Sequence, residues 1–80
     1  MRTDFFLHKG AWVHYAVFGD SERGFRARAD VSFLKKFPAS YVSVPLERTY
    51  ARAEEAEAAI IDFCKDFIEE SLLEDVLEKE

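Results

Sequence analysis

Three side chains in this sequence, His8, His14 and Cys64, belong to the types that bind metals or act as nucleophiles. A structural zinc site needs four close ligands, commonly in pairs about two to four residues apart. No such pair occurs here, and Cys64 falls among the apolar positions of a helical segment. A nucleophilic cysteine also needs partial exposure and a neighbouring base. We therefore expect no metal and no cofactor, and we expect Cys64 to be a small buried hydrophobic residue.

Carboxylates are the most abundant reactive groups. Those that follow one another along one side of the predicted helix are Asp62, Asp66, Glu69 and Glu70. Two carboxyl groups can act as acid and base when their surroundings separate their pKa values, but water screens such groups on the outside of a helix. The sequence has no glycine-rich phosphate loop, Ser-His-Asp arrangement or metalloprotease motif. We predict a solvated acidic face and a protein that is not an enzyme.

The elements that position these residues fall into two halves, of which the first predicts strands. Residues 10–18 are rich in aromatic and β-branched residues, which favour strands. Residues 25–33 alternate apolar and polar side chains, which is typical of a half-buried strand. The glycine-flanked segment 19–24 between them predicts a hairpin turn. Residues 4–8 could open the first strand, with Gly10 as a bulge or bend.

A further strand is predicted after a connection over residues 34–40. It covers residues 41–44 and could resume at Leu46, beyond Pro45. Because proline has no N–H to donate to a ladder, we expect this strand to lie at a sheet edge or to carry a bulge.

The second half predicts a helix from Ala53 onward, since it contains no Gly or Pro and is dominated by Ala, Glu, Leu and Lys. The stripe expected to face the sheet consists of Ala56, Ala59, Ile60, Phe63, Cys64 and Phe67. Residues expected to be almost fully buried are Ile60, Phe63 and Phe67, against Ala27, Ala29 and Val31.

A second apolar stripe lies nearly opposite the first if the helix is straight. It consists of Leu72, Leu73, Val76 and Leu77. Either the helix breaks near Ser71, where Ser71 to Glu74 forms a capping-box pattern, or one long helix presents this stripe to a partner. Exposed apolar patches usually mark interfaces, so we take these four residues as a candidate interface and expect a homodimer.

Together these elements predict an α+β fold, a three- to four-stranded antiparallel sheet with one long C-terminal helix packed on one face. We expect residues 1–80 to form a single domain, with the sheet over 4–50 and the helical part over 53–79. Eighty residues suffice for one thin hydrophobic core.

The register of the hairpin decides which side chains are free to bind a ligand. Of the two faces of the first strand, the one with Val13, Tyr15 and Val17 is the more typical core face. The candidate surface patch on the other face is then Trp12, His14, Arg26 and Arg28. A tryptophan beside guanidinium groups could bind an anion or a nucleobase. In the opposite register Trp12 enters the core and the patch disappears.

Several segments resemble a group of small uncharacterised bacterial β-β-β-α proteins. They are Lys9-Gly10-Ala11-Trp12-Val13, Gly24-Phe25-Arg26-Ala27-Arg28-Ala29, Tyr50 and Glu54-Glu55-Ala56-Glu57-Ala58. The resemblance covers about residues 9–69 and implies a hairpin sheet followed by a C-terminal helix. It implies no activity and no functional residues. The chain departs from the group at Arg52, where Ser or Thr is usual, and in the added residues 70–80.

Charge is distributed unevenly along the chain. Residues 1–52 carry nine Lys or Arg against five Asp or Glu, whereas residues 53–80 carry two against eleven, and the net charge is −5. The pI of about 5.0 makes nucleic acid an unlikely partner. A single cysteine and the lack of a signal peptide or transmembrane stretch predict a cytoplasmic protein.

The function predicted from these patterns is that of a small non-enzymatic binding or regulatory module acting as a homodimer. One alternative is an inhibitor or mimic whose acidic helix blocks a basic site on another protein. A weaker alternative is a sheet-face binder of nucleic acid or a small anion.

Overall fold

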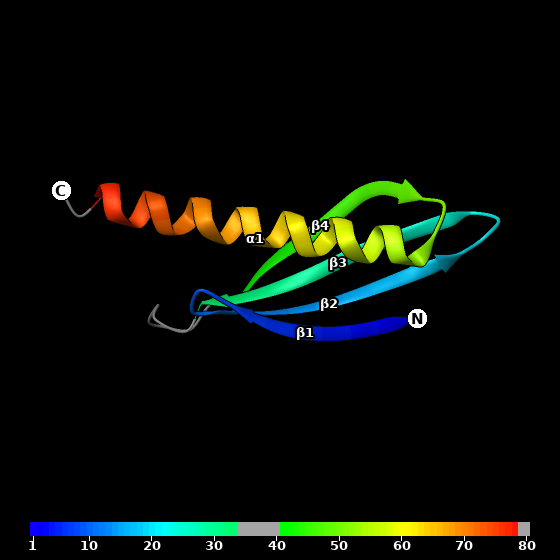
Figure 1. Cartoon of the computed structure of the whole chain (residues 1–80), viewed down its shortest axis with the longest axis horizontal. Coiled ribbons are helices and arrows are strands. Elements are labelled where there is room, and N and C mark those ends of the chain that lie inside the picture. Colours follow the sequence, from blue (N-terminus) through cyan, green and yellow to red (C-terminus); the bar gives the residue numbers. More distant parts are fainter. Residues whose placement is uncertain (34–40, 79–80) are drawn as a thin grey trace.

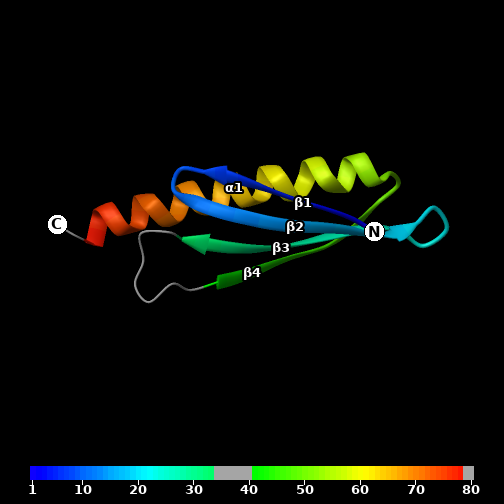
Figure 2. The ribbon, with the colours of Figure 1, turned by 90° about the horizontal axis from the view of Figure 1, so that it is seen from below.

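The structure, a computed structural model, describes residues 1–33 and 41–78, and within them the side chains of residues 1–33 and 42–71. It contains β1 (Arg2–His8), β2 (Ala11–Asp20), β3 (Gly24–Phe33), β4 (Tyr41–Tyr50) and α1 (Ala53–Glu78). The strands form one antiparallel sheet in the order β1-β2-β3-β4, and α1 crosses one face of it (Figures 1 and 2). The predicted α+β fold is therefore confirmed.

The first strand is separate from the second, which the sequence left open. His8 pairs with Ala11 at the end of the β1–β2 ladder. Lys9 and Gly10 between them have φ values of 47° and 81°. Positive φ at both central residues is the signature of a two-residue turn whose twist matches that of the flanking strands. Gly10 therefore belongs to a tight turn and not to a bulge or bend within one strand.

The last strand combines the two expectations raised by Pro45. β4 lies at the edge of the sheet, and Pro45 pairs with Arg28 there. The register also shifts between Phe25, which pairs with Tyr50, and Ala27, which pairs with Leu46. β4 thus has two more residues than β3 over this interval, an irregularity that an edge strand tolerates.

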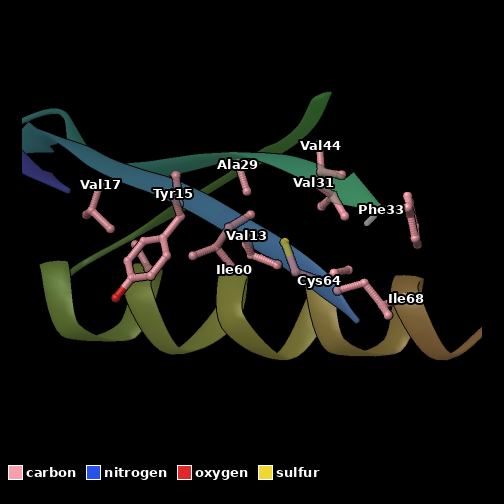
Figure 3. Packing of buried hydrophobic residues seen from close by; sticks show 13 residues of the cluster. Val13, Tyr15, Val17, Ala29, Val31, Phe33, Val44, Ile60, Cys64 and Ile68 are labelled. Carbon is pink, nitrogen blue, oxygen red and sulfur yellow. The ribbon is translucent and has the colours of Figure 1, made fainter. Parts of the chain in front are cut away.

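The hairpin adopts the register with the more typical core face inward. Val13, Tyr15 and Val17 of β2 are 0%, 7% and 2% exposed, as predicted. They pack with residues from β3, β4 and α1, and Figure 3 shows these side chains converging between sheet and helix. The buried set consists of Ala11, Val13, Tyr15, Val17, Ala27, Ala29, Val31, Phe33, Val44, Ala56, Ile60, Cys64 and Ile68.

The helix is continuous from Ala53 to Glu78, so the break considered near Ser71 does not occur. Its length is about 39 Å, and its C-terminal end extends past the strands (Figures 1 and 2). The backbone of the candidate interface Leu72, Leu73, Val76 and Leu77 is helical, and the side chains of those four residues lie outside the described part.

The buried line of α1 corrects the predicted stripe. Ala56, Ile60, Cys64 and Ile68, each 0% exposed, form this line. Phe63 is 47% exposed and Phe67 is only half-buried, so their predicted near-complete burial is wrong. A four-residue step advances about 40° around a helix, so the buried line rotates along α1, as packing on a twisted sheet requires. The prediction assumed a stripe parallel to the helix axis.

Candidate functional site on the outer sheet face

The face of the sheet turned away from α1, which we call the outer face, has no described element packed on it (Figure 2). Side chains alternate between the two faces of a strand, so the inward residues of β2 and β3 place their neighbours outside. The outer face consists of Thr3, Phe5 and Leu7 of β1, Trp12, His14, Ala16 and Phe18 of β2, Arg26, Arg28, Asp30 and Ser32 of β3, and Ser43 and Pro45 of β4.

Apolar and aromatic side chains occupy the β1–β2 half of this face. Phe5 lies between Trp12 and His14, with ring centroids 5.5 Å from each. Phe5, Leu7 and Phe18 remain 58%, 55% and 37% exposed. These residues place a group of large hydrophobic side chains in water on one face of the sheet.

Charges of both signs occupy the β3–β4 half. Arg26 and Arg28 are exposed, and Asp30 follows on the same face of β3. The Ser43 hydroxyl of β4 donates a hydrogen bond of 2.9 Å to the carboxylate of Asp30. Because Asp30 stands beside the two arginines, this half of the face is mixed in charge and not a continuous basic patch.

The candidate surface patch is on one face, as predicted, but its members do not all adjoin. Pairing places Trp12 opposite Ser32, whereas Arg28 is opposite Ala16 and Arg26 is opposite Phe18. At about 3.3 Å per residue, Trp12 is about 13 Å along the sheet from the level of Arg28. His14 is nearer, two residues from that level. The predicted arrangement of Trp12 beside the arginines is therefore wrong.

Two hollows lie over the outer face. A volume of about 780 Å³ is lined by Phe5, His14, Phe18, Arg28 and Asp30 among other residues. A second volume, of about 440 Å³, adjoins it through Phe18 and Arg28. The hollows join the aromatic half of the face to the charged half, so a partner seated there would contact both.

Phe5, Leu7, Phe18 and Asp30 belong to this face and were not among the predicted site residues. Phe5 and Leu7 could not be assigned before β1 was known to be a strand of its own. Phe18 and Asp30 follow from the alternation of β2 and β3 once the inward face is fixed.

On the helix side, polar contacts fasten β1 and β2 to α1. The Tyr15 hydroxyl donates a hydrogen bond of 2.8 Å to Glu57, and the Arg2 guanidinium lies 3.3 Å from the same carboxylate. Burial and the hydrogen bond to Glu57 raise the pKa of Tyr15 to about 12. Glu57 thus links α1 to both β1 and β2.

At the other end of β1, the Lys9 ammonium lies 2.5 Å from Glu69 and the His8 ring 3.8 Å from it. The hydrogen bond and the charge of Lys9 hold the pKa of Glu69 below its usual value. Asp62, Asp66, Glu69 and Glu70 are all exposed, in agreement with the predicted solvated face.

Cys64 is fully buried under the sheet, and burial raises the pKa of its thiol to about 11. It is therefore a core residue, as predicted. Within residues 1–33 and 42–71, no three His, Cys, Asp or Glu side chains gather closely enough to hold a metal ion. In the described part of the chain, α1 does not provide an apolar stretch that could cross a bilayer.

Comparison of the chain with protein-family models finds no match, and comparisons with curated proteins and with solved structures find none either. The resemblance over residues 9–69 stays an expectation.

Proposed function

We propose that the protein is a small non-enzymatic binding module, and that the outer face of its sheet is the surface through which it binds another polypeptide. The observation that carries the proposal is the exposure of Phe5, Leu7 and Phe18 on one face, together with the rings of Trp12 and His14. Removing such a patch from water lowers the free energy, and contiguous exposed apolar patches commonly mark protein interfaces.

The charge of the outer face favours a protein partner over nucleic acid. Nucleic-acid binding draws on a concentration of cations that neutralises phosphates. Here Arg26 and Arg28 share the face with Asp30, and the whole chain carries a net charge of −5. A polypeptide can present apolar side chains opposite β2 and both acidic and basic side chains opposite β3. Such a surface complements the outer face better than a nucleic acid does.

The alternative of an acidic mimic has less support from the fold. Two of the helix glutamates, Glu57 and Glu69, already pair with Arg2 and Lys9 of the same chain. A mimic would need the carboxylates of α1 free to contact a basic site, and these two are engaged within the fold.

Photocross-linking from two phenylalanines separates these functions. Phe18 on the outer face and Phe63 on α1 are both part-exposed, at 37% and 47%, so they form a matched pair for replacement by benzoylphenylalanine. After irradiation in the cells that produce the protein, we expect a covalent adduct from position 18 and none from position 63. Adducts only from position 63 would support the acidic mimic and overturn the proposal.

A specificity control uses the apolar residues of β1. Replacing Phe5 and Leu7 by Ser in the chain labelled at position 18 should abolish the adduct, because both side chains are more than half exposed on the proposed surface. Their exposure also means that the change removes little core packing. An adduct that survives this change would show that the outer face does not select the partner.

A further inference from the structure

We propose that the occupant of the outer face is a second copy of this chain, packed sheet against sheet about a two-fold axis that crosses β2 and β3 at Tyr15 and Ala29. The inference rests on the proposed function and names its partner. This proposal agrees with the homodimer predicted from the sequence but places its interface on the sheet and not on α1.

The first argument is the order of charges on β3. Arg28 and Asp30 project from the same face on either side of Ala29, about 7 Å apart along the strand. Consider a two-fold axis that lies in the interface plane and runs perpendicular to the strands. It places each residue opposite the partner's residue on the same strand that is equally far from the axis on its other side. With the axis at Ala29, Arg28 therefore faces the partner's Asp30, and the symmetry creates this ion pair twice.

The second argument is that the same axis matches the aromatic residues of β2. Tyr15 pairs with Ala29, so the axis also crosses β2 at Tyr15. Trp12 and Phe18 lie three residues from it on opposite sides, and Phe18 therefore faces the partner's Trp12. Offset or edge-to-face aromatic contacts of this kind add about 0.5–1.5 kcal/mol beyond their buried area.

The third argument is that no like charges oppose each other among the described residues of the outer face. Arg26 lies three residues from the axis and faces the partner's Ser32, which leaves its charge at the rim of the contact. On β1, which the axis crosses at Asp4, Phe5 faces the partner's Thr3. An axis parallel to the strands between β2 and β3 would instead set Arg28 against the partner's Ala16, and the ion pair with the partner's Asp30 would not form.

Sheet twist limits which pairs keep this alignment. Two aligned sheets pack about 10 Å apart with their strands rotated by about 30°. A residue one position from the axis moves less than about 2 Å sideways under that rotation, whereas one three positions away moves about 5 Å. The reciprocal pair of Arg28 and the partner's Asp30 is thus the most direct signature of the proposed geometry.

The size of the face is sufficient for a dimer at the lower end of specific interfaces. Four strands overlapping over seven residues project an area of about 23 Å by about 19 Å. The side chains standing on it increase the accessible area further, toward the roughly 600–800 Å² per partner of specific complexes. We therefore expect self-association in the micromolar range.

Charge reversal at positions 28 and 30 tests the geometry by sedimentation equilibrium of the purified chain. In the Arg28→Asp variant two carboxylates face each other across the axis, and in the Asp30→Arg variant two guanidinium groups do, each twice per dimer. Each variant should therefore weaken the dimer at least about tenfold. When the two variants are mixed, both contacts become opposite in sign. The mixture should form a heterodimer within about threefold of the wild-type affinity.

Two controls separate this geometry from a general charge effect. Arg26→Asp mixed with Asp30→Arg should not form the heterodimer, because position 26 faces the partner's Ser32. Asp62→Lys makes the same change of charge at an exposed position of α1, away from the outer face, and its dimer should match the wild type. Circular dichroism of every variant checks that the exposed substitutions leave the fold intact.

Each remaining outcome overturns the inference. A wild type that stays monomeric at high micromolar concentration excludes a second copy, and single variants that dimerise normally, or a mixture that does not recover, exclude the proposed axis. The proposed function is tested separately by the cross-linking. If the wild type is monomeric but position 18 still cross-links to a different protein, the outer face remains a binding surface and only the second copy is excluded. If neither association nor an adduct is seen, both fall.

Discussion

Replacing Ile60 by Ala tests where the core of this small domain is centred. Ile60 is 0% exposed and lies in the middle of the buried line of α1, facing β2 and β3 (Figure 3). Truncating a buried isoleucine loses its transfer free energy and leaves a cavity, at a cost of about 2–5 kcal/mol. A domain of this size has a total stability of roughly 4–12 kcal/mol. The variant should therefore lose a large part of the stability of the domain.

Phe63→Ala is the matched comparison, because the sequence placed both residues in the same buried stripe. Phe63 is 47% exposed, so about half of the usual 1.5–3 kcal/mol for burying its side chain is at stake. Alanine recovers about 0.5 kcal/mol through its better helix propensity. The net loss should stay below about 1 kcal/mol, against about 3 kcal/mol for Ile60→Ala.

Urea unfolding followed by circular dichroism measures both changes. All samples need one low protein concentration, since self-association would add stability that depends on concentration. A loss of 3 kcal/mol corresponds to a melting temperature lower by about 12–24 °C in a domain of this size. Equal destabilisation by the two substitutions, or a larger loss for Phe63→Ala, would refute the rotated packing of α1.

Three further predictions concern the core and the turns. Tyr15→Phe removes the hydrogen bond to Glu57 and should lower the free energy of unfolding by about 1 kcal/mol at neutral pH. Because the pKa of Tyr15 is raised to about 12, the stabilisation by this hydrogen bond is complete below pH 10 and disappears as pH rises through 12, which urea unfolding at several pH values would show. Cys64 should react with a thiol reagent at least about a hundredfold faster in denaturant than in the native protein, because its thiol is buried and its pKa is raised to about 11. Gly19→Ala should destabilise by more than about 2 kcal/mol, because φ there is 119° and a Cβ would collide with a backbone oxygen of β3, whereas Gly10→Ala, at φ 81° with open space around it, should cost about 1 kcal/mol.

Most of the fold follows from local patterns. The alternation of residues 25–33 corresponds to β3, and the segment after Ala53 without Gly or Pro is α1. The sequence left open whether β1 is a separate strand, because Lys9 precedes Gly10 in the turn, and lysine is rarely found at positive φ. Local propensity therefore gave no reason to end a strand at His8.

The phase of α1 depended on tertiary structure. A stripe at three- and four-residue spacing fits Phe63 as well as it fits Ile60, and only the twist of the sheet decides between them. The four-residue line from Ala56 to Ile68 was visible in the sequence, but nothing local favours it over the straight stripe.

The composition of the outer face was predictable in part. The sequence indicated that Trp12, His14, Arg26 and Arg28 share a face, but their neighbours along the strands depend on the hairpin register. That register follows from the turn: once Asp20 pairs with Gly24, every β2–β3 pair is fixed, and Trp12 must lie opposite Ser32. The flanking glycines at 19 and 24 carried this signal.

The distribution of charge distinguishes the two surfaces through which copies of this chain could meet. Residues 53–80 carry eleven acidic residues against two lysines, so a dimer formed through α1 would bring two strongly negative helices within about 10 Å of each other. In a sheet-to-sheet dimer the helices lie on opposite outer sides, separated by two sheets and about 30 Å. That distance exceeds the Debye length of about 8 Å at physiological ionic strength, so their repulsion is screened. Raising the salt concentration should therefore leave the dimer unchanged or weaken it slightly through the pair of Arg28 and the partner's Asp30. A dimer that tightens steeply with salt would instead place the acidic helices at the interface.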